Sequence, residues 1–158
     1  MIQTIIDDLV AANRILADHN VLDAFGHVSA RHPAKPDRYL LSRNLAPALV
    51  TSGDILEYDL DSKPINAGDK RSFLERFIHG EIYKSRQEVN AVVHSHSPTV
   101  IPFGVTQTKL RPISQMGSFL APGVPIFEIR DAGGMTDLLV RDNQLGGALA
   151  AVLGQKLT

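Results

Sequence analysis

The stretch that most constrains this chain is Asn90–Pro98, which reads NAVVHSHSP. An apolar run ends there in two histidines that are one residue apart, His94 and His96. Side chains alternate between the two faces of a strand, so both imidazoles point the same way and lie close enough to share one metal ion. Imidazole is the commonest metal ligand in proteins. The pair alone fits two partly exposed polar residues equally well, so a metal site requires further ligands.

The composition restricts the residue types that can supply these further ligands. The chain contains no cysteine, which leaves histidine, aspartate and glutamate to complete a metal site. Sixteen basic and seventeen acidic residues give a net charge of -1 with no long run of one sign, which excludes the electrostatic pattern of nucleic-acid or membrane binding. The N-terminus has no basic leader followed by an apolar block. We therefore expect a soluble, cytoplasmic protein that acts on a small molecule.

A second candidate group lies in the segment SFLERFIHGEIY, whose apolar spacing predicts a helix that ends near Arg86. Glu75 and His79 are four residues apart, on one face of this helix. Glu75 follows Ser72 by three residues, the spacing of a capping box, so its carboxylate has a structural interpretation as well as a catalytic one. His79 is in the same way either a surface residue or part of a site.

Two loops offer groups that bind anions. The segment GHVSAR, from Gly26 to Arg31, combines a glycine turn with a hydroxyl and a guanidinium, which together can bind a phosphate or a carboxylate. A plain β-turn explains it equally well. The segment Thr51–Gly53 carries ordinary turn residues and is the weaker candidate.

The order of predicted elements indicates one α/β domain over residues 1–158. Apolar residues at helical spacing follow Thr4, and another helix is expected from about Asn143, with Gly154 as its end. Five segments are predicted as strands: a short one with Val28 and Ala30 after the Gly26 turn, Tyr39–Ser42, Asp54–Leu60, VNAVVHSH and VPIFEIRD.

Taken in order, these motifs resemble the class II aldolase/adducin family. The resemblance covers nearly the whole chain, from an N-terminal helix to the His94 and His96 pair. It implies a three-layer α/β/α fold around a mixed, largely antiparallel sheet. It also implies that His94 and His96 bind a divalent metal, usually zinc and in some members manganese, cobalt or iron, and that the chains assemble as homotetramers.

The resemblance assigns further roles. Glu75 is implied as the acid/base residue, working best if partial burial raises its pKa towards neutrality. A metal-stabilised enolate is implied as the intermediate of carbon-carbon bond cleavage. His79 is implied to lie behind the site or to be structural. The residues expected to bind substrate are Gly26, His27, Ser29, Arg31, Thr51, Ser52, Gly53 and Phe73.

Three departures from the family pattern narrow the expected function. His27 replaces an asparagine, and Phe73 and Leu74 replace serines that bind phosphate in sugar-phosphate aldolases. The sequence is more similar to the branch that decarboxylates hydroxylated aromatic or pyridine carboxylic acids. The family's third metal histidine has no counterpart, because no histidine follows His96. We therefore expect a domain that is incomplete at its C-terminus and binds metal weakly.

The leading prediction is a metal-dependent carbon-carbon lyase that decarboxylates a hydroxylated aromatic or keto carboxylic acid. A class II aldolase acting on a hydroxy-keto or sugar-phosphate substrate is the first alternative. A histidine-bound ferrous ion would also fit an oxygenase. From a different class, an adducin-like interaction module or an inactive fragment would keep the fold without the chemistry.

Overall fold

The computed structural model describes all of residues 1–158, in five α-helices, three short 3-10 helices and one four-stranded sheet. The elements in chain order are α1 (Ile2–Asp18), β1 (His27–Arg31), β2 (Arg38–Ser42), η1 (Pro47–Leu49), η2 (Ser52–Asp54), β3 (Ile55–Asp59), α2 (Arg76–Ser85), β4 (Ala91–His94), α3 (Ile101–Gly104), η3 (Gln115–Leu120), α4 (Ile129–Gly133) and α5 (Asn143–Leu153).

The sheet has the strand order β3-β2-β1-β4, and all of its strand pairs are antiparallel. The prediction of a largely antiparallel sheet is confirmed, although none of these strands contributes the parallel pair that would make it mixed. β4 lies at an edge of the sheet beside β1, and its last residue, His94, is directly opposite His27. This register brings the start of the GHVSAR segment next to the predicted metal ligands.

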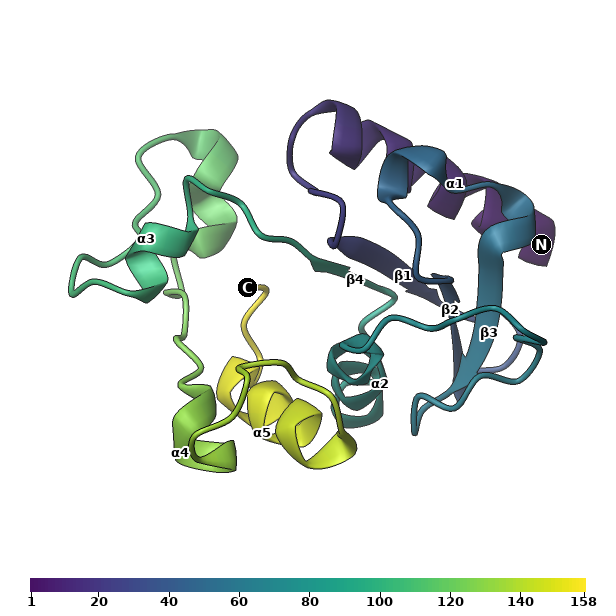
Figure 1. Ribbon diagram of the computed structural model, residues 1–158. Helices are drawn as coiled ribbons and strands as arrows, with labels where there is room; N and C mark the ends of the chain where they lie inside the picture. The colour runs from purple at the N-terminus through teal and green to yellow at the C-terminus, as the bar shows by residue number, and fades with distance from the viewer.

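Helices cover both faces of the sheet, as Figure 1 shows. On one face α1 packs Leu9 against Val28 and Leu40. On the other face Tyr39 and Leu41, which alternate with Leu40 along β2, join the larger core formed with α2 and α5. The three-layer α/β/α arrangement predicted from the sequence is therefore confirmed.

The contact between α2 and α5 depends on a glycine. A Cβ atom at Gly146 would lie 2.7 Å from the carbonyl oxygen of Phe77 and 3.0 Å from Cγ of Glu81. Both distances are shorter than a relaxed contact, so a larger residue would force the two helices apart. α5 begins and ends as predicted: the Asp142 side chain accepts a hydrogen bond from the Leu145 amide, and Gly154 follows the last turn with a φ of 55°.

One predicted strand is wrong. The segment VPIFEIRD contributes no strand, and its second half enters the short helix α4 instead. Glu128 begins this helix by accepting a hydrogen bond of 3.1 Å from the Arg130 amide. Local capping thus competes successfully with the alternating pattern, which has no neighbouring strand to pair with.

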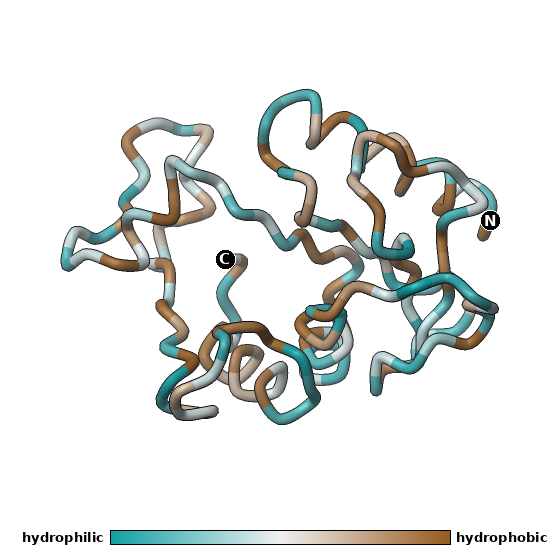
Figure 2. Tube along the Cα trace, viewed as in Figure 1, coloured by the Kyte–Doolittle hydropathy of each residue, from teal (hydrophilic) through white to brown (hydrophobic).

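Residues 101–126 project away from the two helical layers (Figure 1). Brown, hydrophobic positions occur along this projecting segment as well as in the packed core (Figure 2). Three of its side chains are almost fully exposed: Val105 at 79%, Ile113 at 99% and Met116 at 90%. None of the helices combines the length and the apolar character that crossing a membrane requires.

Candidate metal centre

Glu75, His94 and His96 converge at the end of β4 next to the start of α2. Each offers one ligand atom, and these atoms all lie within 4.8 Å of one another. Nε2 of His94 is 2.9 Å from Nε2 of His96 and 3.4 Å from Oε2 of Glu75. The two histidines that the sequence places on one side of a strand thus do face the same point in space.

The spacing of these donor atoms fits a metal ion. Two nitrogens that bind one zinc ion at about 2.0–2.1 Å are roughly 3 Å apart, which is the separation of the His94 and His96 nitrogens. Two imidazoles and one carboxylate are also a donor set of catalytic zinc sites. The three side chains are only partly buried, so an ion there would keep a position open for substrate or water.

Asp23 holds His96 in this orientation. Its Oδ2 atom is 3.1 Å from Nδ1 of His96, and its Oδ1 atom accepts hydrogen bonds from the amides of Phe25 and Gly26. A carboxylate on Nδ1 fixes the ring so that Nε2 is free to bind a metal. Asp23 was not predicted from the sequence. The sequence feature that could have identified it is its position three residues before Gly26, where an aspartate typically closes a turn.

The start of α2 leaves the Glu75 side chain free for the site. The capping box with Ser72 does not form: Glu75 is the N-cap residue but makes no capping hydrogen bond, and the Ser72 hydroxyl accepts from Tyr58. Oε1 of Glu75 instead accepts a hydrogen bond of 3.1 Å from the Val140 amide, while Oε2 faces His94.

The pKa of Glu75 is not raised towards neutrality, the condition under which it was expected to work best. Burial raises the pKa of its carboxyl group, but His94 and the Val140 amide stabilise the carboxylate and lower the pKa by more, so the net value lies below the usual range. Glu75 is therefore a carboxylate in this arrangement.

His27 lies beside the metal group formed by Glu75, His94 and His96. Its ring also begins a chain of hydrogen bonds that leads into the core. Its ring stacks on that of His94, with 4.9 Å between centroids, and its Nδ1 is 2.6 Å from Nε2 of His79. His79 is fully buried, and its Nδ1 is 2.6 Å from the Ser29 hydroxyl, which in turn is 2.8 Å from that of Tyr83. Ser29 is also fully buried, so its predicted contact with substrate stays a prediction without support from its position.

Phe73 and Gly26 also lie near His27 and His94. The ring of Phe73 is 4.4 Å from that of His27, between centroids, and is buried. At Gly26 an added Cβ would lie 2.8 Å from Leu22 and 3.1 Å from the backbone oxygen of His94. Gly26 therefore allows the chain before β1 to approach the end of β4 closely.

The structure does not bring Arg31 to the metal group. Arg31 ends β1, at the opposite end of the strand from His27. Its guanidinium donates to the backbone oxygens of four residues, namely Val89, Pro36, Tyr83 and Arg86. These bonds commit the side chain to joining β1 to the end of α2, so a contact with a substrate carboxylate is not supported.

The Thr51–Gly53 turn also lies apart from the metal group, at the start of β3. The Thr51 hydroxyl donates to the Asp54 carboxylate over 2.6 Å, and Asp54 accepts from the Thr51 amide as well. These bonds, with a further one from Arg43, lower the pKa of Asp54 to about 2. Ser52 and Gly53 are exposed beside this cap.

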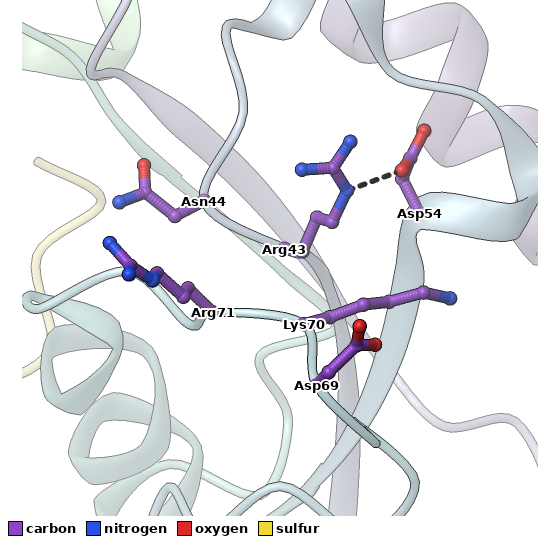
Figure 3. Close-up of a pocket in the computed structure, with 6 residues that line it drawn as sticks. All are labelled: Arg43, Asn44, Asp54, Asp69, Lys70 and Arg71. Carbon is purple, nitrogen blue, oxygen red and sulfur yellow. Dashed lines mark hydrogen bonds and ion pairs between the residues drawn. The ribbon is translucent and has the colours of Figure 1, made fainter.

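An open cavity of about 570 Å³ lies next to this turn and was not predicted from the sequence. Figure 3 shows its lining, in which Arg43 points to Asp54 while the Asn44 and Arg71 side chains lie together. The lining is entirely polar: Arg43, Asn44, Asp54, Asp69, Lys70 and Arg71.

Strand register relates this cavity to the metal group. Extending the β1–β2 pairing places Arg43 opposite His27, which is itself opposite His94. Residues in one row of an antiparallel sheet point to the same face, and neighbouring strands are about 4.8 Å apart. The backbone of Arg43, one of the cavity-lining residues, is therefore expected about 10 Å from that of His94, in the same row of the sheet.

Comparison with known proteins gives this geometry a context. Residues 7–156 match the family described as Class II Aldolase and Adducin N-terminal domain. The chain is 42% identical over 146 residues to Decarboxylase tropJ of Talaromyces stipitatus, a match that covers 89% of this chain and 55% of the relative. It is 30% identical over 162 residues to a 3,4-dihydroxyphthalate decarboxylase of Arthrobacter keyseri, covering 94% of this chain and 62% of the relative.

The fold has close counterparts among solved structures. An L-fuculose 1-phosphate aldolase from Glaciozyma antarctica superposes with a TM-score of 0.76 at 25% identity, over 96% of this chain and 57% of that protein. The chain thus spans only 55%, 62% and 57% of the length of these three proteins.

Proposed function

This chain belongs to the class II aldolase and adducin family, and from that premise we propose that it is part of a metal-dependent lyase that decarboxylates a hydroxylated carboxylic acid. The observation that carries the proposal is the convergence of Glu75 with His94 and His96 within 4.8 Å. Identity of 42% to one named decarboxylase and 30% to another supports decarboxylation over aldol cleavage.

Zinc is the proposed metal, because imidazole nitrogens are usual ligands of catalytic zinc; manganese, cobalt and iron are the alternatives. When bound, such a cation supplies Lewis acidity that stabilises negative charge on substrate oxygens. His94 and His96 would hold it, with Asp23 fixing the ring of His96.

Glu75 carries the proton in this proposal. Its Oε1 is anchored by the Val140 amide, so that Oε2 stays directed at the metal group. Oε2 takes the proton of the substrate hydroxyl. When carbon dioxide leaves, the ring or chain carbon that carried it keeps the electron pair of the broken bond, and Oε2 returns the proton to that carbon. A positioned carboxylate of this kind contributes about 10²–10⁴-fold to a reaction rate.

The polar cavity supports an acidic substrate. Arg43 is paired with Asp54, and Lys70 donates to the Gly53 carbonyl, whereas no ion pair or hydrogen bond of the Arg71 guanidinium is present. We assign to the cavity a second acidic group of the substrate, bound by the Arg71 guanidinium.

Assembly belongs to the same proposal. The exposed apolar side chains of the projecting segment 101–126 would be covered if that segment packs against another copy of the chain. A homotetramer, which the sequence resemblance implies, would do this. Sedimentation analysis of the zinc-loaded protein measures the number of copies directly.

The experiment that tests the function measures carbon dioxide release from hydroxylated aromatic mono- and dicarboxylic acids, with cleavage of hydroxy-keto acids and sugar phosphates as the second arm. Zinc-dependent release of carbon dioxide is the expected result. Cleavage confined to the second arm would make the protein an aldolase instead. Activity in neither arm would favour the non-catalytic interaction module.

A further inference from the structure

Four polar side chains form one hydrogen-bonded chain that starts beside the metal group and ends in the core. His27 bonds to His79, His79 to Ser29 and Ser29 to Tyr83, over 2.6, 2.6 and 2.8 Å. All four are at most 1% exposed. No water reaches the inner three, so each of their hydrogens must find its acceptor within this group.

Both imidazoles in this chain are neutral. Neither ring has a hydrogen bond or an ion pair with a carboxylate, and a buried charge without such a partner is strongly disfavoured. A neutral imidazole has one N–H donor and one bare nitrogen acceptor. The position of the proton on one ring, Nδ1 or Nε2, therefore determines its position on the other ring.

One arrangement of hydrogens gives an acceptor to every donor of the inner three residues, His79, Ser29 and Tyr83. Tyr83 donates its hydroxyl hydrogen to Ser29, and Ser29 donates to Nδ1 of His79. His79 then carries its proton on Nε2 and donates it to Nδ1 of His27. His27 in consequence carries its own proton on Nε2.

The reverse arrangement leaves a donor without an acceptor. If Nδ1 of His79 donates to Ser29, the two hydroxyl groups of Ser29 and Tyr83 have only each other as acceptors. One of their hydrogens then has no partner, and a buried unsatisfied donor destabilises the arrangement. The first arrangement is therefore favoured.

The free donor that remains is Nε2–H of His27. This atom has no hydrogen-bond partner in the chain and is not among the polar atoms sealed from the surface. The His27 ring stacks on the ring of His94 at an angle of 21°. The one open end of the buried chain thus lies at the metal group.

We propose that His27 presents Nε2–H as a fixed hydrogen-bond donor to an anionic oxygen of the substrate, and that His79, Ser29 and Tyr83 are positioning residues that impose this tautomer. The inference rests on the proposed function for the identity of the substrate, a hydroxylated carboxylate. It gives His27, which the sequence resemblance implies only as a substrate-binding residue, a defined tautomer and a defined donor atom.

Nitrogen-15 NMR of the imidazole rings tests the tautomers without any substrate. The chain has six histidines, and His27→Gln identifies the His27 signals by their loss. Both His27 and His79 are expected as Nε2–H tautomers in the wild-type protein. A proton on Nδ1 of either ring would overturn the proposal, whatever the enzyme activity.

Salicylate, a hydroxylated aromatic carboxylate, tests the donor role. Titrated into the zinc-loaded protein, it should bind His27→Leu at least about tenfold more weakly than wild type, as expected when a charge-assisted hydrogen bond is lost. His27→Gln, whose amide keeps an N–H at a similar distance from the backbone, should restore most of the affinity. Zinc affinity, measured separately, should be alike in both variants.

Equal salicylate binding by His27→Leu and wild type would refute the donor role even if the tautomers are as expected. Failure of the proposed function is distinguishable, because it would appear as no carbon dioxide release while the tautomers and the difference in salicylate binding persist.

Discussion

The Oε2 atom of Glu75 lies 3.4 Å from the Nε2 atom of His94, which joins the start of α2 to the end of β4. His94 follows Glu75 by nineteen positions in the sequence. The Val140 amide donates a hydrogen bond to Oε1 of Glu75 and so keeps its Oε2 directed at His94. A carboxylate without a helix-capping role is thus directed at two imidazoles, and the chemistry proposed for the protein depends on that arrangement.

Replacing Glu75 by glutamine should remove catalysis and leave substrate binding nearly intact. The amide keeps the shape of the side chain but cannot carry the proton, so kcat for carbon dioxide release should fall by about 10²–10⁴. Glu88→Gln, which changes an exposed carboxylate elsewhere, is the matched control. Unchanged kcat in Glu75→Gln would exclude this residue as the proton carrier.

Replacing Arg71 by alanine should weaken the binding of dicarboxylic substrates. The guanidinium lines the polar cavity and has no partner there, so its loss should raise KM for a dicarboxylate by about tenfold, with little effect on a monocarboxylate. Lys109→Ala, an exposed cation on the projecting segment, serves as control. An equal change for both substrate types would show that the cavity does not bind the second acidic group.

Gly146→Ala should destabilise the fold by about 1–3 kcal/mol in urea denaturation followed by circular dichroism. The added methyl group would lie 2.7 Å from the Phe77 carbonyl oxygen at the contact of α2 with α5. At the next position, Gly147, the nearest neighbour of such a group is the Glu81 carboxylate, 3.7 Å away. Gly147→Ala should therefore be neutral or stabilise by up to about 1 kcal/mol through helix propensity. Similar losses in both variants would contradict this packing.

Asp54 should contribute stability that depends on pH. Its folded-state pKa of about 2 lies below the ordinary value of 3.8, so the contribution is present above about pH 4 and is lost as the pH falls towards 2. Asp54→Asn should be less stable at pH 7 by about 1–2 kcal/mol and should lack this part of the acid dependence. Asp8→Asn, at an exposed position on α1, should behave like wild type. A wild-type acid profile in Asp54→Asn would refute the assignment.

Local patterns in the sequence predicted the elements that define the fold. Helical spacing and the Asn143 and Gly154 signals gave α5 correctly. The predicted strand VNAVVHSH ends earlier than expected, at His94, and His96 approaches His94 from beyond the strand end. The failure at VPIFEIRD has a physical cause: an alternating pattern becomes a strand only where a partner strand is available, and here a cap at Glu128 begins a helix.

The site was predictable only where its chemistry is local. The relation of Asp23 to His96 and the cavity around Arg43 both require tertiary contacts that no spacing reveals. The same holds for Ser29 and Arg31: the sequence shows a hydroxyl and a guanidinium, whereas the fold directs one into the core and commits the other to backbone carbonyls.

Calorimetric titration with zinc tests the central claim most directly. Wild-type protein should bind one ion, and His94→Ala or His96→Ala should each lower the zinc affinity at least about tenfold. Loss of a residue that only orients a ligand already lowers metal affinity by about that factor, and loss of the ligand itself should lower it more. His19→Ala, at an exposed histidine after α1, should bind like wild type. Zinc binding that is absent in the wild type, or equal in wild type and His94→Ala, would contradict a metal centre at Glu75, His94 and His96.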